Sequence, residues 1–245
     1  AVVTPSERLL SERFAESPSG LFMLAGHIVA DDPIDWDDVL AKFRTQDFSF
    51  LGSWSGRFAL AVVDRSRAEL YLATDRLGQY PLYVAADERG LAFSTSQASF
   101  CRWLDRPDLN TDWFVELFLA NFSFSHSSFL CGVSRLGPAT VMRFDQAGIE
   151  RGRWEYAPAY RTRPVDGGTE DEVRRAIDVF KDRMPRYASP TERVVLGLTS
   201  GFDSRAVLAM FAGHPGLSGF TYGIDGCEDI KVGRKLATAS GLDYC

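Results

Sequence analysis

The sequence predicts an α+β domain with antiparallel sheets, followed by the start of an α/β domain with a parallel sheet. Short apolar runs separated by polar turns dominate the first part of the chain, whereas the last part alternates apolar runs with amphipathic segments. Between them lies Tyr160–Gly168, whose arginines, proline and glycines are typical of a linker. We therefore assign residues 1–158 to the first domain and residues 169–245 to the second.

The first domain is expected to be a meander of short strands interrupted by two helices. An acidic start and apolar residues at helical spacing predict a helix over Asp35–Phe43. A second helix is predicted over Thr111–Ala120, with Thr111 as its N-cap. The expected antiparallel strands are Phe58–Val63, Leu70–Ala73, Pro81–Val84, Leu91–Ser94 and Thr140–Phe144.

The second domain shows the alternation of strands and helices that builds a parallel sheet. Thr169 and Glu172 form a candidate capping box, and the apolar run Arg193–Thr199 predicts a strand buried on both faces. Next come a helix from Ser204 to about Phe211, a strand over Gly219–Ile224 and a helix from about Glu228 to Ala239. Two β–α units are too few to cover both faces of a parallel sheet, so we expect the chain to be a fragment.

The composition favours a globular protein without a nucleic-acid or membrane partner. The 245 residues are 45% hydrophobic and 24% charged, with a net charge of −6 and no concentration of basic residues. No stretch approaches the roughly 18 apolar residues of a membrane helix, and the N-terminus lacks the pattern of a signal peptide. The four cysteines, Cys101, Cys131, Cys227 and Cys245, have no metal-like spacing. Free thiols indicate a reducing compartment, so a cytoplasmic location is expected.

The segment Leu196–Arg205 is the candidate functional site. A buried strand is predicted to turn into a helix here, which directs unpaired backbone N–H groups and the positive end of the helix dipole toward a ligand. Gly201 allows close approach to the backbone, and Asp203 could hold a divalent cation. Further hydroxyl donors are Thr199, Ser200 and Ser204. These residues favour a phosphate-binding loop, and a Ser/Gly-rich turn without a ligand is the alternative.

Two competing motifs do not fit this segment. A P-loop requires GxxxxGK[ST], and the chain contains no Gly-Lys pair. A nucleophile elbow requires G-x-S-x-G, but Gly197 precedes Ser200 by three residues rather than two. A P-loop NTPase and a serine hydrolase are therefore disfavoured.

Five segments, in the same order, resemble the asparagine synthetase family. Thr199–Ser204 resembles its pyrophosphate loop, Ser-Gly-Gly-Leu-Asp-Ser, and Gly223–Ala237 resembles its second strand and following helix. The other three resemble its N-terminal glutaminase-like domain, and they are Gly56–Asp64, Asp75–Tyr83 and Arg135–Ala139 with Phe144-Asp145. Because the matches extend over nearly the whole chain, they are much more specific together than any one alone.

The resemblance implies an Ntn-hydrolase-like first domain and an ATP-pyrophosphatase second domain. It also implies that ATP and Mg²⁺ bind here, with Asp203 as a metal ligand and the backbone around Gly223 at the adenine. The phosphate-binding residues would be Thr199, Ser200, Gly201, Phe202, Asp203 and Ser204. Two departures from the family are Thr199-Ser200 in place of Ser-Gly, and Arg205 in place of a small residue. Arg205 is expected either to meet a phosphate or carboxylate, or to be an exposed helix residue.

The residues that hydrolyse glutamine in this family are missing at three places. Glutaminases of the family begin with a cysteine, whereas this chain begins Ala1-Val-Val. Ala25 stands where the family has the asparagine that stabilises the oxyanion, and Thr45–Ser55 is too short for the usual glutamine-binding acid and its helix. We therefore expect no glutaminase activity.

The expected function is that of an ATP-dependent, AMP-forming amide synthetase, closest in character to β-lactam synthetases and lasso-peptide cyclases. The substrate would be a small molecule or peptide that carries both a carboxylate and the attacking amine. The alternatives are an asparagine synthetase that uses ammonia or glutamine, and a non-catalytic relative that binds nucleotide or peptide. A homodimer is one possible oligomeric state. The sequence assigns no catalytic residue.

Overall fold

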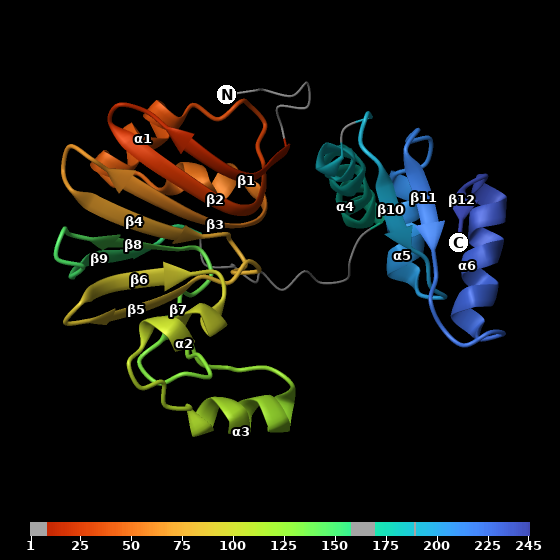
Figure 1. Ribbon diagram of the computed structural model, residues 1–245. Coiled ribbons are helices and arrows are strands. Elements are labelled where there is room, and N and C mark those ends of the chain that lie inside the picture. The colour runs from red at the N-terminus through yellow and green to blue at the C-terminus, as the bar shows by residue number, and fades with distance from the viewer. Residues whose placement is uncertain (1–8, 158–169, 189) are drawn as a thin grey trace. The chain divides into compact units, whose positions relative to one another are not determined.

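The computed structural model describes residues 9–157, 170–188 and 190–245, and the side chains from residue 14 onward. The chain divides into two compact units, one up to the segment 158–169 and one after it (Figure 1). We describe each unit by itself. Thr169, half of the candidate capping box, lies outside the described residues.

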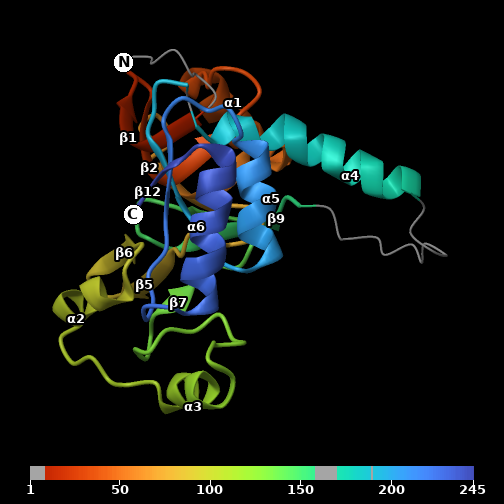
Figure 2. The same cartoon turned by 90° about the vertical axis from the view of Figure 1, so that its right-hand side faces the viewer.

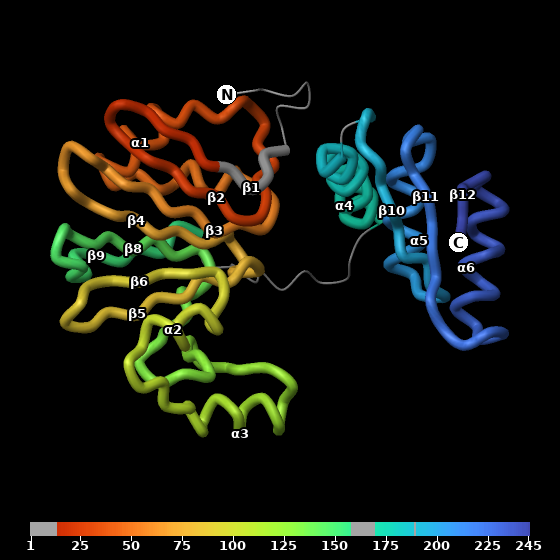
Figure 3. The backbone as a smooth tube through the Cα atoms, in the orientation of Figure 1, coloured from red at the N-terminus to blue at the C-terminus, as the bar shows by residue number. Residues whose placement is uncertain are grey.

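The N-terminal unit is built on two antiparallel sheets, as expected. The larger sheet has the order β1 (Leu9–Glu16), β2 (Gly20–Val29), β3 (Ser55–Asp64), β4 (Glu69–Thr74), β8 (Thr140–Phe144) and β9 (Glu150–Glu155). The smaller sheet has the order β6 (Gly90–Ser94), β5 (Tyr83–Asp87) and β7 (Ser134–Arg135). The path of the chain in Figure 3 shows that β8 returns to the larger sheet, beside β4, after the excursion through the smaller one.

Three α-helices of this unit are α1 (Trp36–Thr45), α2 (Phe100–Trp103) and α3 (Thr111–Ala120). The first is capped by Asp35, whose Oδ1 accepts hydrogen bonds from the N–H groups of Asp37 at 2.9 Å and Asp38 at 3.3 Å. The predicted cap of α3 is wrong by one residue. Asn110, not Thr111, is the N-cap, because its Oδ1 accepts the N–H of Trp113 at 3.3 Å.

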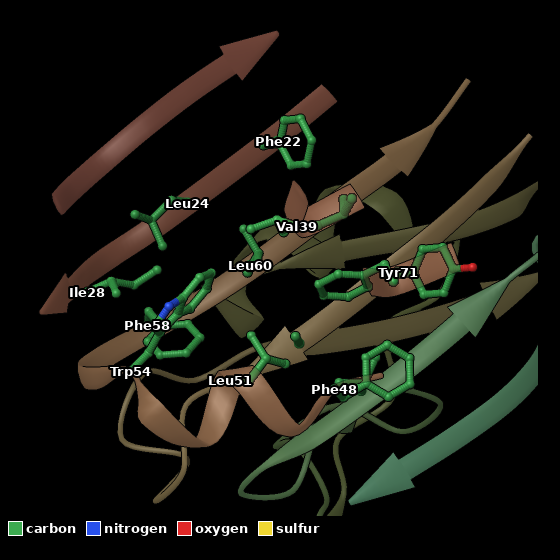
Figure 4. Packing of buried hydrophobic residues seen from close by; sticks show 14 of the residues in the cluster. Phe22, Leu24, Ile28, Val39, Phe48, Leu51, Trp54, Phe58, Leu60 and Tyr71 are labelled. Carbon is green, nitrogen blue, oxygen red and sulfur yellow. The ribbon is translucent and has the colours of Figure 1, made fainter. Parts of the chain in front are cut away.

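The apolar residues of this unit fall into successive layers. A cluster between α1 and the larger sheet includes Phe22, Leu60 and Tyr71, and Figure 4 shows these side chains on the face of the sheet. Ala61 and Leu72, from the opposite face, pack against residues of the smaller sheet. Because β2 and β3 place apolar side chains on both faces, these strands lack the apolar–polar alternation of a half-exposed sheet. The sequence prediction missed β1, β2, β7 and β9 entirely.

A buried ion pair fixes α1 to the end of β3. The side chain of Asp64 is fully buried and accepts two hydrogen bonds from Arg44, at 2.6 Å from Nε and 2.8 Å from Nη2. It also accepts hydrogen bonds from Ser66, through the N–H at 2.9 Å and Oγ at 2.7 Å. The hydrogen bonds from Arg44 are the largest cause of a pKa of Asp64 that lies well below its ordinary value of 3.8.

Asp64→Asn is expected to lower the free energy of unfolding by about 2 kcal/mol, because the charge-assisted bonds to Arg44 are lost. Since the pKa is lower in the folded state, the wild-type contribution is present above about pH 4 and disappears as the pH falls through the lowered folded-state pKa. Denaturant unfolding at pH 7 and pH 3 measures both effects. Asp87→Asn, at an exposed pair with Arg89, is the control, and an equal loss in the two variants would contradict the assignment.

The C-terminal unit contains a parallel three-stranded sheet, as the sequence predicts. Its order is β10 (Val194–Gly197), β11 (Leu217–Phe220) and β12 (Asp243–Tyr244). The helices are α4 (Glu170–Arg183), α5 (Phe202–Met210) and α6 (Glu228–Ser240), with a 3₁₀ turn at Met184–Tyr187. In Figure 2, α4 extends away from the sheet of this unit, while α5 and α6 lie close to each other.

The expectation that β10 is buried on both faces is wrong for the described residues. Leu198, just after the strand, is fully buried, but the side chain of Val195 is 63% exposed. Three apolar residues of α4, Val173, Ile177 and Phe180, are also exposed. The core of this unit lies instead between the other face of the sheet and the helices, and its buried members include Leu208, Phe211 and Ala237.

Candidate functional site

The candidate loop joins the carboxyl end of β10 to α5. Leu198 continues the strand by donating its N–H to the carbonyl oxygen of Phe220 at 2.8 Å. The carbonyl of Leu198 accepts a hydrogen bond from Oγ1 of Thr221 at 2.6 Å, so that both strand ends are joined here. The helix begins at Phe202, two residues earlier than predicted, with Gly201 as its N-cap. Asp203 therefore lies in the first helical turn.

Two hydroxyl side chains shape the loop from within. Oγ of Ser204 accepts the N–H of Thr199 at 3.2 Å, and Oγ1 of Thr199 accepts the N–H of Gly201 at 3.2 Å. The two hydroxyl oxygens are themselves 3.2 Å apart. Because Gly201 has no side chain, no side-chain oxygen of the N-cap is available to the first-turn N–H groups of α5. The loop thus lies at the positive end of a helix that has no side-chain cap.

Ser200 is bonded to the next helix rather than to its own loop. Its N–H and its Oγ both donate to Oδ1 of Asp229, at 2.7 Å and 2.6 Å. The hydrogen bond from the Ser200 hydroxyl is the main cause of a lowered pKa of Asp229. This amide N–H already binds a carboxylate oxygen, which is the kind of acceptor that an anionic ligand would provide.

Arg205 is an exposed residue of α5 whose side chain folds back over the loop. Its Nε donates to the carbonyl oxygen of Gly201 at 3.2 Å, and its Nη2 donates to that of Ser200. The guanidinium carbon lies 4.8 Å from the ring centroid of Phe202. A positive charge is therefore fixed beside the loop, on the side of its carbonyl groups.

Gly223 lies after β11, in the connection to α6, and the loop of Thr199–Ser204 lies after β10. Because β10 and β11 are parallel neighbours, both segments meet the same edge of the sheet, where α/β proteins bind ligands. Asp203 is exposed. Within the described ranges, no group of three or more His, Cys, Asp or Glu side chains is arranged to hold a metal ion.

The sequence reasoning missed Asp229 and Gly233 as parts of this site. A Cβ atom at Gly233 would collide with Oγ1 of Thr221 and lie 3.0 Å from the hydroxyl of Tyr244. Glycine at this position therefore lets α6 pack directly on the strand ends, which brings Asp229 to the loop. The acidic pair Glu228-Asp229, at the predicted start of the following helix, was the available signal.

The N-terminal unit places the segment that resembles the glutaminase oxyanion region in the middle of β2. Ala25 pairs with Ala59 on β3, and its methyl group donates no hydrogen bond. Gly26 has a φ of +86°, and a Cβ there would contact the carbonyl oxygen of Arg57 and the ring of Tyr80. Burial and the charge of Arg57 lower the pKa of the neighbouring His27.

The sequence of the chain is similar to those of several known proteins. Residues 34–155 match the family model of the glutamine amidotransferase domain. Asparagine synthetase 3 [glutamine-hydrolyzing] of Bacillus subtilis is 27% identical over 186 residues, which are 72% of this chain and 29% of that protein. A putative asparagine synthetase [glutamine-hydrolyzing] of Mycobacterium bovis is 25% identical over 238 residues, which are 89% of this chain and 35% of that protein.

Among solved structures, the chain is similar to glutamine phosphoribosylpyrophosphate amidotransferase of Bacillus subtilis, complexed with ADP and GMP. The identity is 13% and the TM-score 0.34, over 97% of this chain and 47% of that one. The chain spans about a third of the length of the curated relatives it matches. The matches to the glutamine amidotransferase domain and to the two asparagine synthetases support the asparagine synthetase family at a coarse level. In the described part of the chain, no helix is long and apolar enough to cross a membrane.

Proposed function

We propose that the chain belongs to an ATP-dependent, AMP-forming amide synthetase in which Thr199–Ser204 binds the phosphates of ATP. The observation that carries the proposal is the contact of Ser200 with a carboxylate oxygen, at the start of a helix whose N-cap is glycine. Amide N–H groups at such a helix start bind anions through their dipoles and hydrogen bonds. The resemblance of this loop to the family's pyrophosphate loop supports the same assignment.

The proposed reaction has two steps. A substrate carboxylate oxygen bonds to the α-phosphorus of ATP, the bond to the bridging oxygen breaks, and pyrophosphate leaves. An amine then attacks the acyl carbon, AMP departs with the electron pair of the broken bond, and the amine loses a proton. A divalent cation bound with ATP supplies positive charge to the phosphates.

This chain would contribute orientation and charge to the first step. The hydroxyls of Thr199 and Ser204 lie together after the end of β10, where they accept the loop amides of Gly201 and Thr199. Asp203 is the residue that would hold Mg²⁺, because its carboxylate is exposed in the first turn of α5 and is a hard oxygen donor. The backbone near Gly223, at the same edge of the sheet, is the proposed adenine contact.

We further propose that the attacking amine belongs to the substrate, so that the product is a lactam or macrolactam. The support is Ala25, whose methyl group lacks the donor needed at an oxyanion. A tethered amine can reach an effective concentration of about 10⁵ M, whereas free ammonia is mostly protonated near neutral pH. The second candidate is an asparagine synthetase that uses ammonia or glutamine, and the names of the two relatives favour it. A non-catalytic nucleotide- or peptide-binding role is the third.

The amine source is tested with the whole protein, Mg·ATP and alternative amine donors. We expect no glutamate from glutamine and no useful asparagine synthesis from aspartate with ammonium, but AMP release with a linear substrate that carries both groups. Chromatography coupled to mass spectrometry separates these products. Glutamate release that a substitution in β2 abolishes would contradict the proposal, and steady asparagine formation would support the second candidate.

A further inference from the structure

The hydrogen bonds between Ser200 and Asp229 have a consequence for ligand binding. Asp229 lies in the first turn of α6, and a single oxygen atom, Oδ1, accepts both the N–H and the hydroxyl of Ser200. The amide that the proposed function assigns to a phosphate is thus already used by a negatively charged side chain. An entering phosphate competes for this N–H group and meets the repulsion of a like charge.

We propose that Asp229 is an internal anion that occupies the phosphate loop in the absence of nucleotide and must leave Ser200 before a phosphate can bind. This inference rests on the proposed function of the loop. We call Asp229 a latch, meaning a residue that sets how readily the loop accepts an anion. The side chain of Asp229 contacts the loop and not the reacting atoms.

The latch depends on Ser200, where the family that the loop resembles has glycine. Glycine at this position would leave only the amide N–H to bind Asp229. The serine hydroxyl adds a second hydrogen bond, at 2.6 Å, to the same carboxylate oxygen. Charge-assisted bonds of this kind are stronger than bonds between neutral groups. Serine therefore makes the state in which Asp229 is bonded to residue 200 more stable than glycine would.

The helix that carries the latch is held firmly against the strand ends. Gly233 allows α6 to approach Thr221 and Tyr244 so closely that a methyl group would not fit. The carbonyl of Leu198, at the base of the loop, is bonded to the same Thr221. Release of the latch is therefore expected to occur by rotation of the Asp229 and Ser200 side chains, while α6 stays in place.

The test is the binding of inorganic pyrophosphate to the whole protein. EDTA is present to chelate divalent cations, so that they do not contribute to the measured affinity. Asp229→Ala is expected to bind pyrophosphate about tenfold more tightly than wild type, because one charge-assisted competitor is removed. Ser200→Gly, which keeps the amide, should give a smaller gain. The matched control is Glu228→Ala, which removes an equal charge from the adjacent, exposed residue of the same helical turn and is expected to change affinity by less than about twofold.

Hydrogen exchange at the Ser200 amide provides a second readout that does not depend on a ligand. Exchange should become faster in Asp229→Ala and remain unchanged in Glu228→Ala. Equal pyrophosphate affinity in Asp229→Ala and Glu228→Ala would overturn the latch and leave the proposed function standing. Weaker binding in Asp229→Ala would also overturn it, since Asp229 would then help to hold the anion. Absence of pyrophosphate binding to every variant, and of Mg·ATP binding to wild type, would overturn both proposals together.

Discussion

Asp75→Ala is expected to lower the free energy of unfolding of the N-terminal unit by about 4 kcal/mol or more, the largest stability effect among our predictions. Asp75 is 1% exposed and accepts four backbone N–H groups. They belong to Phe58 at 3.1 Å, Leu77 at 3.0 Å, Gln79 at 3.0 Å and Tyr80 at 2.9 Å. Alanine would leave these donors without their charged acceptor, and at least one of them is buried within the sheet.

Denaturant unfolding of wild type, Asp75→Ala and Asp75→Asn measures the effect. Asparagine keeps one acceptor oxygen but turns an NH₂ group toward backbone N–H groups, so it should recover only a minor part of the loss. Asp87→Ala is the control, because its exposed carboxylate accepts a single backbone N–H, that of Arg89 at 2.8 Å. A loss below about 1 kcal/mol in Asp75→Ala would contradict the role of Asp75 as the centre of this turn.

Asp75 also explains why a glutaminase-like segment can persist in a unit for which we propose no glutaminase activity. The segment Asp75–Tyr83 resembles a core stretch of the glutaminase domain, yet its first residue makes contacts that stabilise the fold. Gly26 is likewise required by its positive φ and by the proximity of Arg57 and Tyr80. Ala25 has no positive φ and is subject to no such backbone requirement.

Asp203→Ala is expected to slow the exchange of labelled pyrophosphate into ATP by about 100-fold or more, with the carboxylate substrate present. Whether the Asp203 carboxylate favours or opposes nucleotide binding depends on the metal. A carboxylate near phosphates repels them, and only a bound cation makes it favourable. The loss should therefore require Mg²⁺ and should not appear in nucleotide binding measured in EDTA. Asp243→Ala, at an exposed position of the same unit, is the matched control.

Local sequence patterns predicted much of the architecture but not its closest contacts. The helix over Thr111–Ala120 and the strand over Thr140–Phe144 have the predicted bounds, because each has the residues typical of its element over its full length. The cap at Asn110 was missed because Asn110 and Thr111 are both good N-caps, and only the bond to Trp113 distinguishes them. The strand β2 was missed because both of its faces are apolar.

The contact of Asp229 with Ser200 could not be predicted from local patterns, since it joins residues 29 positions apart through the packing of α6. The parallel order of β10 and β11 was predictable, and with it the edge of the sheet at which such residues meet. Burial of β10 on both faces was wrong, because the apolar run alone does not say which elements cover it.

Calorimetric titration of the whole protein with Mg·ATP tests the phosphate-binding role of Thr199–Ser204 most directly. The account predicts saturable binding by wild type, at least about tenfold weaker binding by Asp203→Ala, and unchanged binding by Cys101→Ser, which alters a thiol of the other unit. Equal affinity of wild type and Asp203→Ala for Mg·ATP would contradict the assignment of this loop.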